Sequence, residues 1–307
     1  MTFIKTEFGF ASTASEVIAG VDLTGKTMIV TGGASGIGIE TVRALATAGA
    51  DVTIAARRPD AAEEVASDLR AAIGNPRIHV AALDVADLAS VRAFVAGWDR
   101  PLHALINNAG VMAVPELQRT AEGREMQFAT NYLGHFALTL GLHPWLKAAQ
   151  GARVVSVSST GSLFGSVQWD DPDFRFTRYD PILAYGQSKT ACILMAVGLA
   201  RRWRADGITA NALNPGAIAT NLQRHTGGLR TPEHLRKTPE QGGATSVLLA
   251  ASPVLDGISG RYFDDCAAAN IISERGTRLE GVAPYALNAA NADRLWEMAT
   301  AMIGGAA

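Results

Sequence analysis

The stretch TMIVTGGASGIG, residues 27–38, indicates the fold class of this chain. Its first part is a short apolar run, typical of a buried strand. A glycine-rich turn follows, and a helical pattern then continues to about Ala48. Glycines at such a junction make the turn tight and let backbone N–H groups approach a phosphate. The stretch therefore predicts a strand, a phosphate-binding turn and a helix whose positive N-terminus faces the ligand.

The glycines are spaced G-x-x-x-G-x-G, at Gly32, Gly36 and Gly38. This spacing differs from the G-x-G-x-x-G of the common dinucleotide fingerprint. A tight turn without a ligand is the alternative interpretation. The position of the turn directly after a first strand favours the phosphate site.

Short apolar runs alternate with helical patterns along most of the chain. Strands are expected at residues 27–30, 51–56, 77–83, 102–106, 153–157, 208–213 and 260–263. Helices are expected up to residue 48 and at residues 60–73, 116–149 and 182–205. Strands alternating with helices of this length predict right-handed βαβ units. The fold class is therefore α/β: a single doubly wound, Rossmann-like domain with a parallel sheet of about seven strands and helices on both faces.

Composition excludes several classes of protein. Hydrophobic residues make up 48% of the 307 residues and charged ones 18%, which is typical of a globular chain. The net charge of −2 provides no basic field for nucleic acid. Two cysteines, Cys192 and Cys266, form no disulfide framework and indicate a reducing, cytoplasmic location. The six histidines form no metal-binding cluster, so no metal site is predicted.

No segment predicts a membrane span. Residues 1–19 lack a basic region followed by an apolar block, so we expect no signal peptide. The most apolar candidate, residues 132–146, is shorter than the roughly 20 residues that a spanning helix needs. We therefore expect it to be a buried helix.

The end of the second predicted strand bears on coenzyme choice. An acidic residue there would bind the 2′-hydroxyl of NAD, but the chain continues Ala56-Arg57-Arg58. Arg57 can pair with a 2′-phosphate and stack on adenine, which favours NADP(H) and leaves NAD(H) as the alternative. Asp84, after the third strand, is either an acceptor for the adenine amino group or a capping or turn residue before Leu88.

Small residues follow the fourth predicted strand, in Asn107-Asn108-Ala109-Gly110. Ligands of open α/β sheets bind at the carboxyl edge, and small residues there would let a coenzyme lie against it. A plain turn is the alternative.

Tyr185 and Lys189 lie four residues apart in a segment expected to be helical, so both side chains share one face. An ammonium near a phenol favours the phenolate and lowers the phenol's pKa from about 10 toward neutrality. Such a phenol can exchange a proton with an alcohol or carbonyl. With five tyrosines and five lysines, the pair arises by chance in about one such chain in twelve, so it is not decisive alone.

Together these motifs resemble the short-chain dehydrogenase/reductase family over residues 25–263. The motifs are TGGASGIG (31–38), NNAG (107–110), Ser159, Tyr185-x-x-x-Lys189 and NPG (214–216). Within the family the chain looks most like the retinol dehydrogenase and WW-domain oxidoreductase branch. That closer likeness rests on residues 13–25, AAR (55–57), NYLGHF (131–136) and RYFDDC (261–266).

The resemblance implies a role for each matching residue. Ser159 would polarise the substrate oxygen, Tyr185 would be the general acid/base, and Lys189 would bind the nicotinamide ribose. Asn131 would hold a water in the proton relay. The implied coenzyme-binding residues are Gly32, Ser35, Gly36, Ile37, Gly38, Arg57, Asp84, Val85, Asn108, Ala109, Gly110, Tyr185, Lys189, Pro215, Gly216, Ile218 and Thr220. Ser35 departs from the basic residue that many NADP-preferring relatives carry.

The resemblance also implies an activity and a domain plan. It predicts an oxidoreductase that uses NADP(H) on a lipophilic alcohol, aldehyde or ketone and assembles as a homodimer or homotetramer. Residues 1–24 would form a lead-in, 25–263 the catalytic domain, and 264–307 an extension packed on the same domain. Residues 164–181 and 221–239 would be substrate loops, and 227–239 has the composition of a mobile loop or short helical lid.

Two alternatives belong to different functional classes. One is a reductase of a carbon–carbon double bond, related to protochlorophyllide reductase, which would use the same Tyr and Lys. The other is an NADP-binding regulator without catalysis. Such regulators usually lose the Tyr or the Lys, whereas this chain keeps both.

Overall fold

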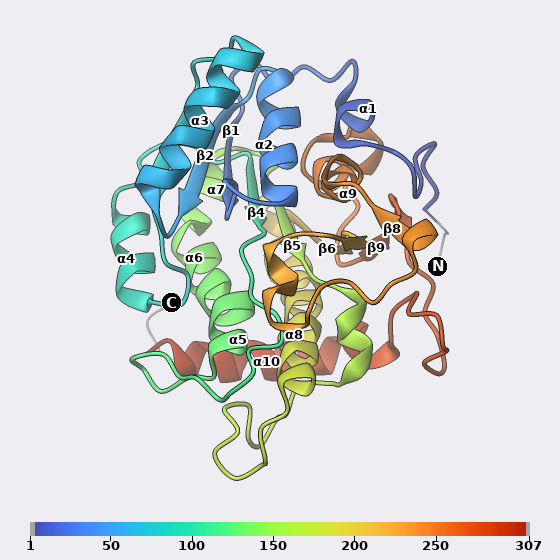
Figure 1. Cartoon of the computed structure of the whole chain (residues 1–307). Coiled ribbons are helices and arrows are strands. Elements are labelled where there is room, and N and C mark those ends of the chain that lie inside the picture. Colours follow the sequence, from blue (N-terminus) through green and yellow to red (C-terminus); the bar gives the residue numbers. More distant parts are fainter. Residues whose placement is uncertain (1–3, 305–307) are drawn as a thin grey trace.

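The computed structural model describes residues 4–304, so residues 1–3 of the lead-in and 305–307 of the extension lie outside the described residues. A β-sheet forms the centre of the molecule (Figure 1). Its eight strands lie in the order β10-β9-β6-β5-β4-β1-β2-β3. The strands are β1 Thr27–Thr31, β2 Asp51–Ala56, β3 Ile78–Ala82, β4 Ala104–Asn107, β5 Arg153–Val157, β6 Thr209–Asn214, β9 Tyr262–Asp264 and β10 Ala267–Ala268. The predicted Rossmann-like α/β fold is confirmed.

The eighth strand corrects the expected count. Seven strands run parallel, and β10 pairs antiparallel with β9. Asp265 and Cys266 connect the two strands with φ angles of 47° and 60°. Two residues with positive φ make the tight turn that a two-residue hairpin requires. Glycine or asparagine usually fills such a turn, so the sequence pattern did not predict it.

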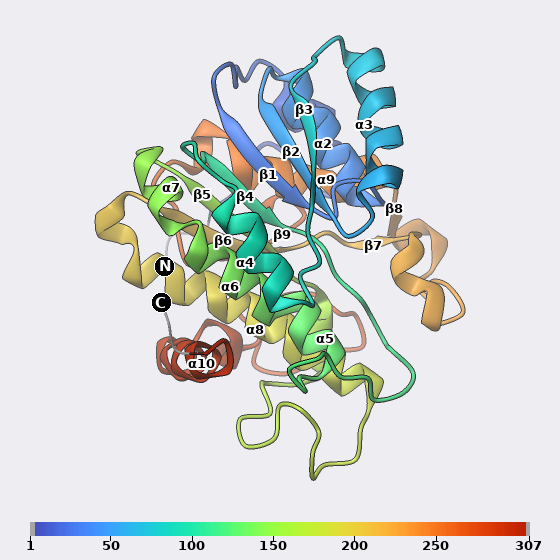
Figure 2. The ribbon, with the colours of Figure 1, turned by 90° about the vertical axis from the view of Figure 1, so that its left-hand side faces the viewer.

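Helices cover both faces of the sheet (Figure 2). One face carries α2 Ile37–Thr47, α3 Pro59–Ile73 and α9 Pro239–Ala251, and the other carries α4 Leu88–Ala96, α6 Gly134–Gly141 and α8 Pro181–Arg202. Side chains alternate along each strand, so β1 serves both cores. Ile29 joins the cluster beneath α8, whereas Met28 and Val30 join the cluster beneath α2 and α9.

The expected continuous helix over residues 116–149 is wrong. The chain is irregular until α5, Met126–Phe128, which Glu125 caps. It then passes through a π-helical turn, Ala129–Leu133, into α6 and breaks before α7, His143–Ala148. Pro144 occupies the first turn of α7, where its missing N–H costs nothing. Helix α4 was not predicted.

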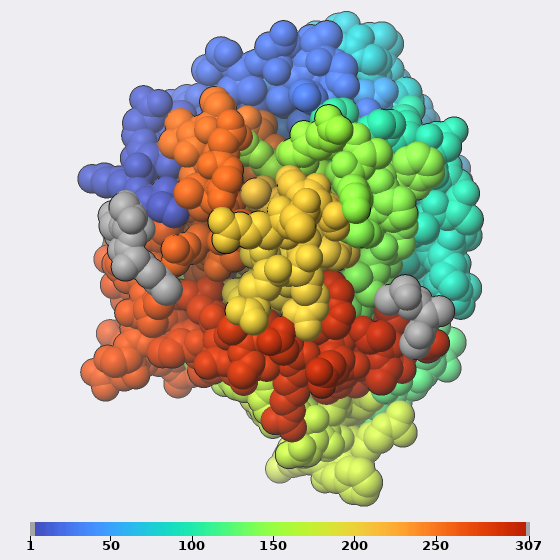
Figure 3. All heavy atoms as spheres, turned by 180° about the vertical axis from the view of Figure 1, so that it is seen from behind, coloured from blue at the N-terminus to red at the C-terminus, as the bar shows by residue number. Residues whose placement is uncertain are grey.

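The remaining elements are short or terminal. They are α1 Ala14–Ile18, β7 Ala217–Ile218, β8 Arg236–Lys237, α10 Ala289–Met302 and the 3-10 helices Thr160–Phe164, Arg204–Asp206, Asn221–His225, Glu233–Leu235, Pro253–Leu255 and Pro284–Leu287. Helix α10 crosses the back of the molecule against α8 (Figure 3). There the ring centroid of Trp296 lies 5.0 Å from that of Phe136 and 6.3 Å from that of Trp203, and both contacts are edge-on.

Helix α8 is buried continuously from Ala184 to Leu199. By length and composition alone this helix, rather than residues 132–146, could cross a membrane. However, 89% of its most apolar window is buried inside the fold. Its apolar character is therefore accounted for by packing between β5, β6 and α10.

Candidate active site

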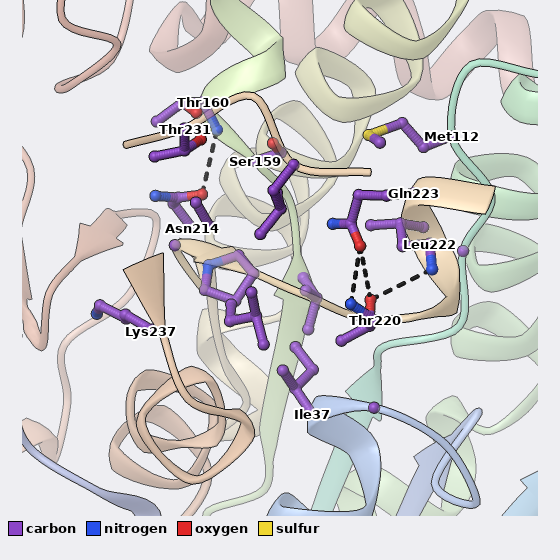
Figure 4. Close-up of a pocket in the computed structure, with 18 of the residues that line it drawn as sticks. Ile37, Met112, Ser159, Thr160, Asn214, Thr220, Leu222, Gln223, Thr231 and Lys237 are labelled. Atoms are coloured by element: carbon purple, nitrogen blue, oxygen red, sulfur yellow. Dashed lines mark hydrogen bonds between the residues drawn. The ribbon is translucent and has the colours of Figure 1, made fainter. Parts of the chain in front are cut away.

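A cavity of about 630 Å³ opens at the carboxyl ends of the central strands (Figure 4). Strand β1 lies between β2 and β4, so the direction of winding reverses there. Open α/β sheets bind ligands at such switch points. The loops after β1, β4, β5 and β6, together with helix α8, bring together most of the predicted site residues, which are Gly32, Ser35, Gly36, Ile37, Asn108, Ala109, Gly110, Ser159, Tyr185, Lys189, Pro215, Gly216, Ile218 and Thr220.

The glycine-rich turn has the geometry that close approach of a phosphate needs. Gly32 and Gly36 adopt φ angles of 65° and 53°, which favour glycine. A Cβ on Gly38 would lie 2.4 Å from the Gly32 carbonyl oxygen, so the turn tolerates no side chain there. Helix α2 begins at Ile37 with no side chain capping its first N–H groups. These N–H groups at the cavity are suited to an anion.

The predicted adenine end lies outside the cavity wall. Arg57 follows β2 and is exposed to solvent. The Asp84 carboxylate accepts a hydrogen bond from the Ala86 N–H at 2.9 Å, so it stabilises a local turn. Asp87, not Asp84, caps α4. Next to this turn, a Cβ on Gly134 would lie 1.7 Å from the Val85 carbonyl oxygen, so the loop rests directly on α6.

Tyr185 and Lys189 lie one turn apart on α8 and both face the cavity, as the spacing predicts. They are 5% and 4% exposed. The Lys189 Nζ lies 5.7 Å from the centroid of the Tyr185 ring and donates a hydrogen bond to the Val157 carbonyl at 3.0 Å. The Ser158 hydroxyl donates to the Lys189 carbonyl at 2.7 Å, so α8 is fixed twice to the end of β5.

Gly161 is a site residue that sequence reasoning missed. A Cβ there would lie 2.6 Å from Tyr185 Cε1 and 3.4 Å from Ser159 Oγ, so its bare backbone holds the ring and the hydroxyl close together. The Ser159 Oγ accepts the Gly161 N–H at 3.0 Å and caps the following 3-10 helix. Tyr285, from the C-terminal extension, donates to the Ser162 carbonyl at 2.7 Å and steadies the same turn.

Asn131 lies behind the cavity wall, in the π-helical turn. Its Oδ1 accepts the Val111 N–H at 2.8 Å, and its Nδ2 donates to the Val111 carbonyl at 2.9 Å. Nδ2 also donates to the Ser188 hydroxyl at 2.8 Å, which in turn donates to the Tyr185 carbonyl at 2.7 Å. The side chain thus links the loop after β4 to the helix that carries Tyr185.

Asp264 lines the cavity and was not predicted. Its Oδ1 accepts a hydrogen bond from Asn214 Nδ2 at 3.0 Å. Burial raises the pKa of Asp264 to about 6. Only its position at the end of the last parallel strand could have indicated it, because its burial depends on distant residues.

Residues 221–239 cover one side of the cavity with two 3-10 helices and strand β8, which pairs in parallel with β7 just before the segment. Thr220 begins this lid, and its N–H donates to Gln223 Oε1 at 2.8 Å (Figure 4). Leu222, Leu229 and Leu235 line the cavity from the lid. Residues 277–280 of the C-terminal extension also line it.

The other predicted substrate loop, residues 164–181, contributes no residue to the described cavity wall. It is fastened instead to the segment before α5. Asp173 pairs with Arg124 at 3.0 Å and accepts the Glu125 N–H at 2.9 Å. The Tyr179 hydroxyl donates to the Val114 carbonyl at 2.8 Å. Burial raises the pKa of Glu125 to about 7, although two backbone N–H groups bind its carboxylate.

We predict that Glu125 makes stability depend on pH. Its folded pKa lies above its ordinary value of 4.5, so folding favours the protonated form. The stabilisation is complete below pH 4.5 and is lost as pH rises through 7, by at most about 3 kcal/mol. Urea unfolding of wild type and Glu125→Gln across this range should show a steeper decline for wild type. Parallel pH profiles of the free energy of unfolding in the two proteins would contradict the prediction. Glu116→Gln, which changes an exposed carboxylate, serves as the control.

Comparison with known proteins gives a consistent result. Residues 26–228 match the sequence profile of the family described as short chain dehydrogenase. A "Probable oxidoreductase" of Streptomyces lividans is 53% identical over 90% of this chain and 97% of its own length. Human retinol dehydrogenase 12 is 38% identical over 92% of this chain and 88% of its own. Mouse polyprenol dehydrogenase is 43% identical over 80% and 77%.

Among solved structures, an uncharacterized protein from Mycobacterium paratuberculosis superposes with a TM-score of 0.75. It is 33% identical in sequence, over 95% of this chain and 97% of its own. The sequence resemblance is thus confirmed, and residues of the catalytic and coenzyme motifs meet in one cavity. The chain belongs to the short-chain dehydrogenase/reductase family, in the branch that includes the retinol dehydrogenases.

Proposed function

We propose that the protein is an NADP(H)-dependent oxidoreductase that transfers hydride between nicotinamide C4 and the carbonyl or carbinol carbon of a lipophilic small molecule. The convergence of Ser159, Tyr185 and Lys189 on the cavity at the switch point supports this most directly. A bound nicotinamide coenzyme would supply or accept the hydride. The uncapped start of α2 and the bare turn at Gly36 and Gly38 suit its phosphates.

The hydrogen bonds that Ser159 and Lys189 form within the protein leave donor groups available to bind a substrate and a coenzyme. Ser159 Oγ accepts the Gly161 N–H, so its own hydrogen is free to bind the substrate oxygen. Lys189 commits one of its three N–H donors to Val157. The other two can bind a coenzyme ribose. The Tyr185 hydroxyl can donate a proton to the substrate oxygen and recover it.

Coenzyme preference follows from the end of β2. No carboxylate follows the strand directly to bind a ribose 2′-hydroxyl, and within residues 4–304 Arg57 forms no salt bridge with an acid. A guanidinium can bind a 2′-phosphate with two parallel hydrogen bonds. NADP(H) is therefore the proposed coenzyme, and NAD(H) the weaker one.

The cavity wall supports a lipophilic substrate. Its apolar side chains come from several segments, namely Phe10, Met112, Leu222, Leu229, Leu235 and Leu279. Two relatives are named for retinol and polyprenol, both apolar alcohols. An alcohol, aldehyde or ketone with an apolar body would place its oxygen at Ser159 and Tyr185 and its body among these side chains.

Location and assembly remain part of the proposal. Cys192 and Cys266 are buried and unpaired, which suits a reducing cytoplasm. We expect a homodimer or homotetramer, as the family resemblance implies.

Replacing Tyr185 with Phe tests the general acid/base directly. The ring and its packing on Gly161 remain, but the proton donor is lost. We predict a fall in kcat of about 10²- to 10⁴-fold, with the Kd for NADPH unchanged within about threefold. Tyr179→Phe is the matched control, because its hydroxyl binds Val114 away from the cavity. Near-normal turnover by Tyr185→Phe on a confirmed substrate would refute the assignment.

Replacing Arg57 with Leu tests coenzyme preference. Loss of a charge-assisted contact with the 2′-phosphate should raise the Kd for NADPH about 10-fold or more and leave that for NADH nearly unchanged. Arg58→Leu removes the neighbouring exposed charge and should change neither. Equal effects of the two variants on NADPH binding would reject a specific role for Arg57.

A further inference from the structure

His135 is a fully buried polar residue that the proposed chemistry does not use. It lies in α6, and its ring bridges two segments of the site. Nε2 is 2.9 Å from the Thr31 hydroxyl at the end of β1. Nδ1 is 3.1 Å from the main-chain carbonyl of Asn131 in the π-helical turn.

The hydrogen bonds around Thr31 fix the direction of the first contact. The Thr31 Oγ accepts the N–H groups of Asn108 and Ala109, at 2.8 and 2.9 Å. Both of its acceptor positions are therefore filled, and only its hydrogen remains to be donated. Its nearest acceptor is His135 Nε2, because the Ile106 carbonyl is farther away at 3.4 Å.

The tautomer of His135 follows from this assignment. If Nε2 accepts from Thr31, then Nδ1 carries the proton and donates it to the Asn131 carbonyl. Burial lowers the pKa of His135 to about 4, with a smaller effect of the Lys189 charge. The ring is therefore neutral near pH 7, and each of its nitrogens has one defined partner.

Each partner belongs to a different half of the site. Thr31 holds the turn at Gly32 against the loop at Asn108 and Ala109, where a Cβ on Gly32 would lie 3.1 Å from Ala109 Cα. Those residues line the cavity. The Asn131 carbonyl also accepts from the Cys192 thiol at 3.2 Å, so the π-helical turn is held from two sides.

We propose that His135 is a positioning residue that couples the coenzyme-binding loops to the segment that carries Asn131. Through Nε2 it orders the loops that bind the coenzyme. Through Nδ1 it orders the turn from which Asn131 donates to the Ser188 hydroxyl, which in turn donates to the carbonyl of Tyr185. The effect on turnover rests on the proposed function, whereas the effect on coenzyme binding is measured without a substrate.

Two substitutions separate the two hydrogen bonds. In His135→Asn the amide nitrogen occupies the place of Nδ1 and can still donate to Asn131, but the Thr31 hydroxyl keeps only the longer contact with the Ile106 carbonyl, at 3.4 Å. In His135→Gln the amide oxygen reaches the place of Nε2 and accepts from Thr31, but the donor to Asn131 is lost. A residue that only fills space in the core would not distinguish these variants.

We expect opposite responses. For His135→Asn, the Kd for NADPH, measured by its fluorescence, should rise about 10-fold while kcat at saturating coenzyme stays within about threefold. For His135→Gln, kcat should fall about 10-fold while the Kd for NADPH stays within about threefold. Parallel changes in both variants, or no change in either, would overturn the proposal.

A second pair of variants tests the same link if a His135 variant does not fold. Thr31→Val removes the hydroxyl, which also accepts the Asn108 and Ala109 N–H groups, and should weaken NADPH binding at least as much as His135→Asn does, while Thr31→Ser should restore it. Where both fold, Thr31→Val combined with His135→Asn should bind NADPH no more weakly than Thr31→Val alone, because Thr31→Val already removes the hydroxyl that His135 contacts. If the wild-type protein binds NADPH but turns over no carbonyl compound, the proposed function is refuted. The Kd values of the variants for NADPH would then still test the effect of His135 on coenzyme binding.

Discussion

The buried ammonium of Lys189 is the constraint around which the site is arranged. A cation with so little exposure is tolerated only where polar groups surround it. The Val157 carbonyl supplies one such group and ties the helix to the end of β5, and the Ser158 hydroxyl ties it again through the Lys189 carbonyl. Tyr185, one turn earlier, is thereby held against Gly161 and beside Ser159. The position of Tyr185 for the proposed proton transfer thus depends on the junction between α8 and β5.

The two sides of the cavity have different origins. The coenzyme side consists of turns that follow β1 and β4, within residues 26–228 that match the family. Much of the opposite side comes from residues 229–237 and 277–280, which lie beyond that match. Membership of the family therefore supports the chemistry of hydride transfer more firmly than it supports any particular substrate.

Local patterns made much of the fold and site predictable. A strand, a glycine turn and a helix follow one another in residues 27–38, and the helical spacing of Tyr185 and Lys189 holds in the structure. Features set by distant contacts were not predictable. Gly161 matters because Tyr185 packs on it, and Asp264 matters because other segments bury it. The turn at Asp265 and Cys266 lacks the glycine that would have signalled a hairpin.

The most direct test of the account follows the hydride itself. NADPH deuterated at the transferring position of C4 would be incubated with the protein and a medium-chain 2-enal, and the product analysed by mass spectrometry and NMR. We predict an allylic alcohol with one deuterium on C1, the former carbonyl carbon. Deuterium on C3 would show reduction of the double bond instead. The absence of any deuterated product from a broad panel of carbonyl compounds, despite tight NADPH binding, would contradict catalysis altogether.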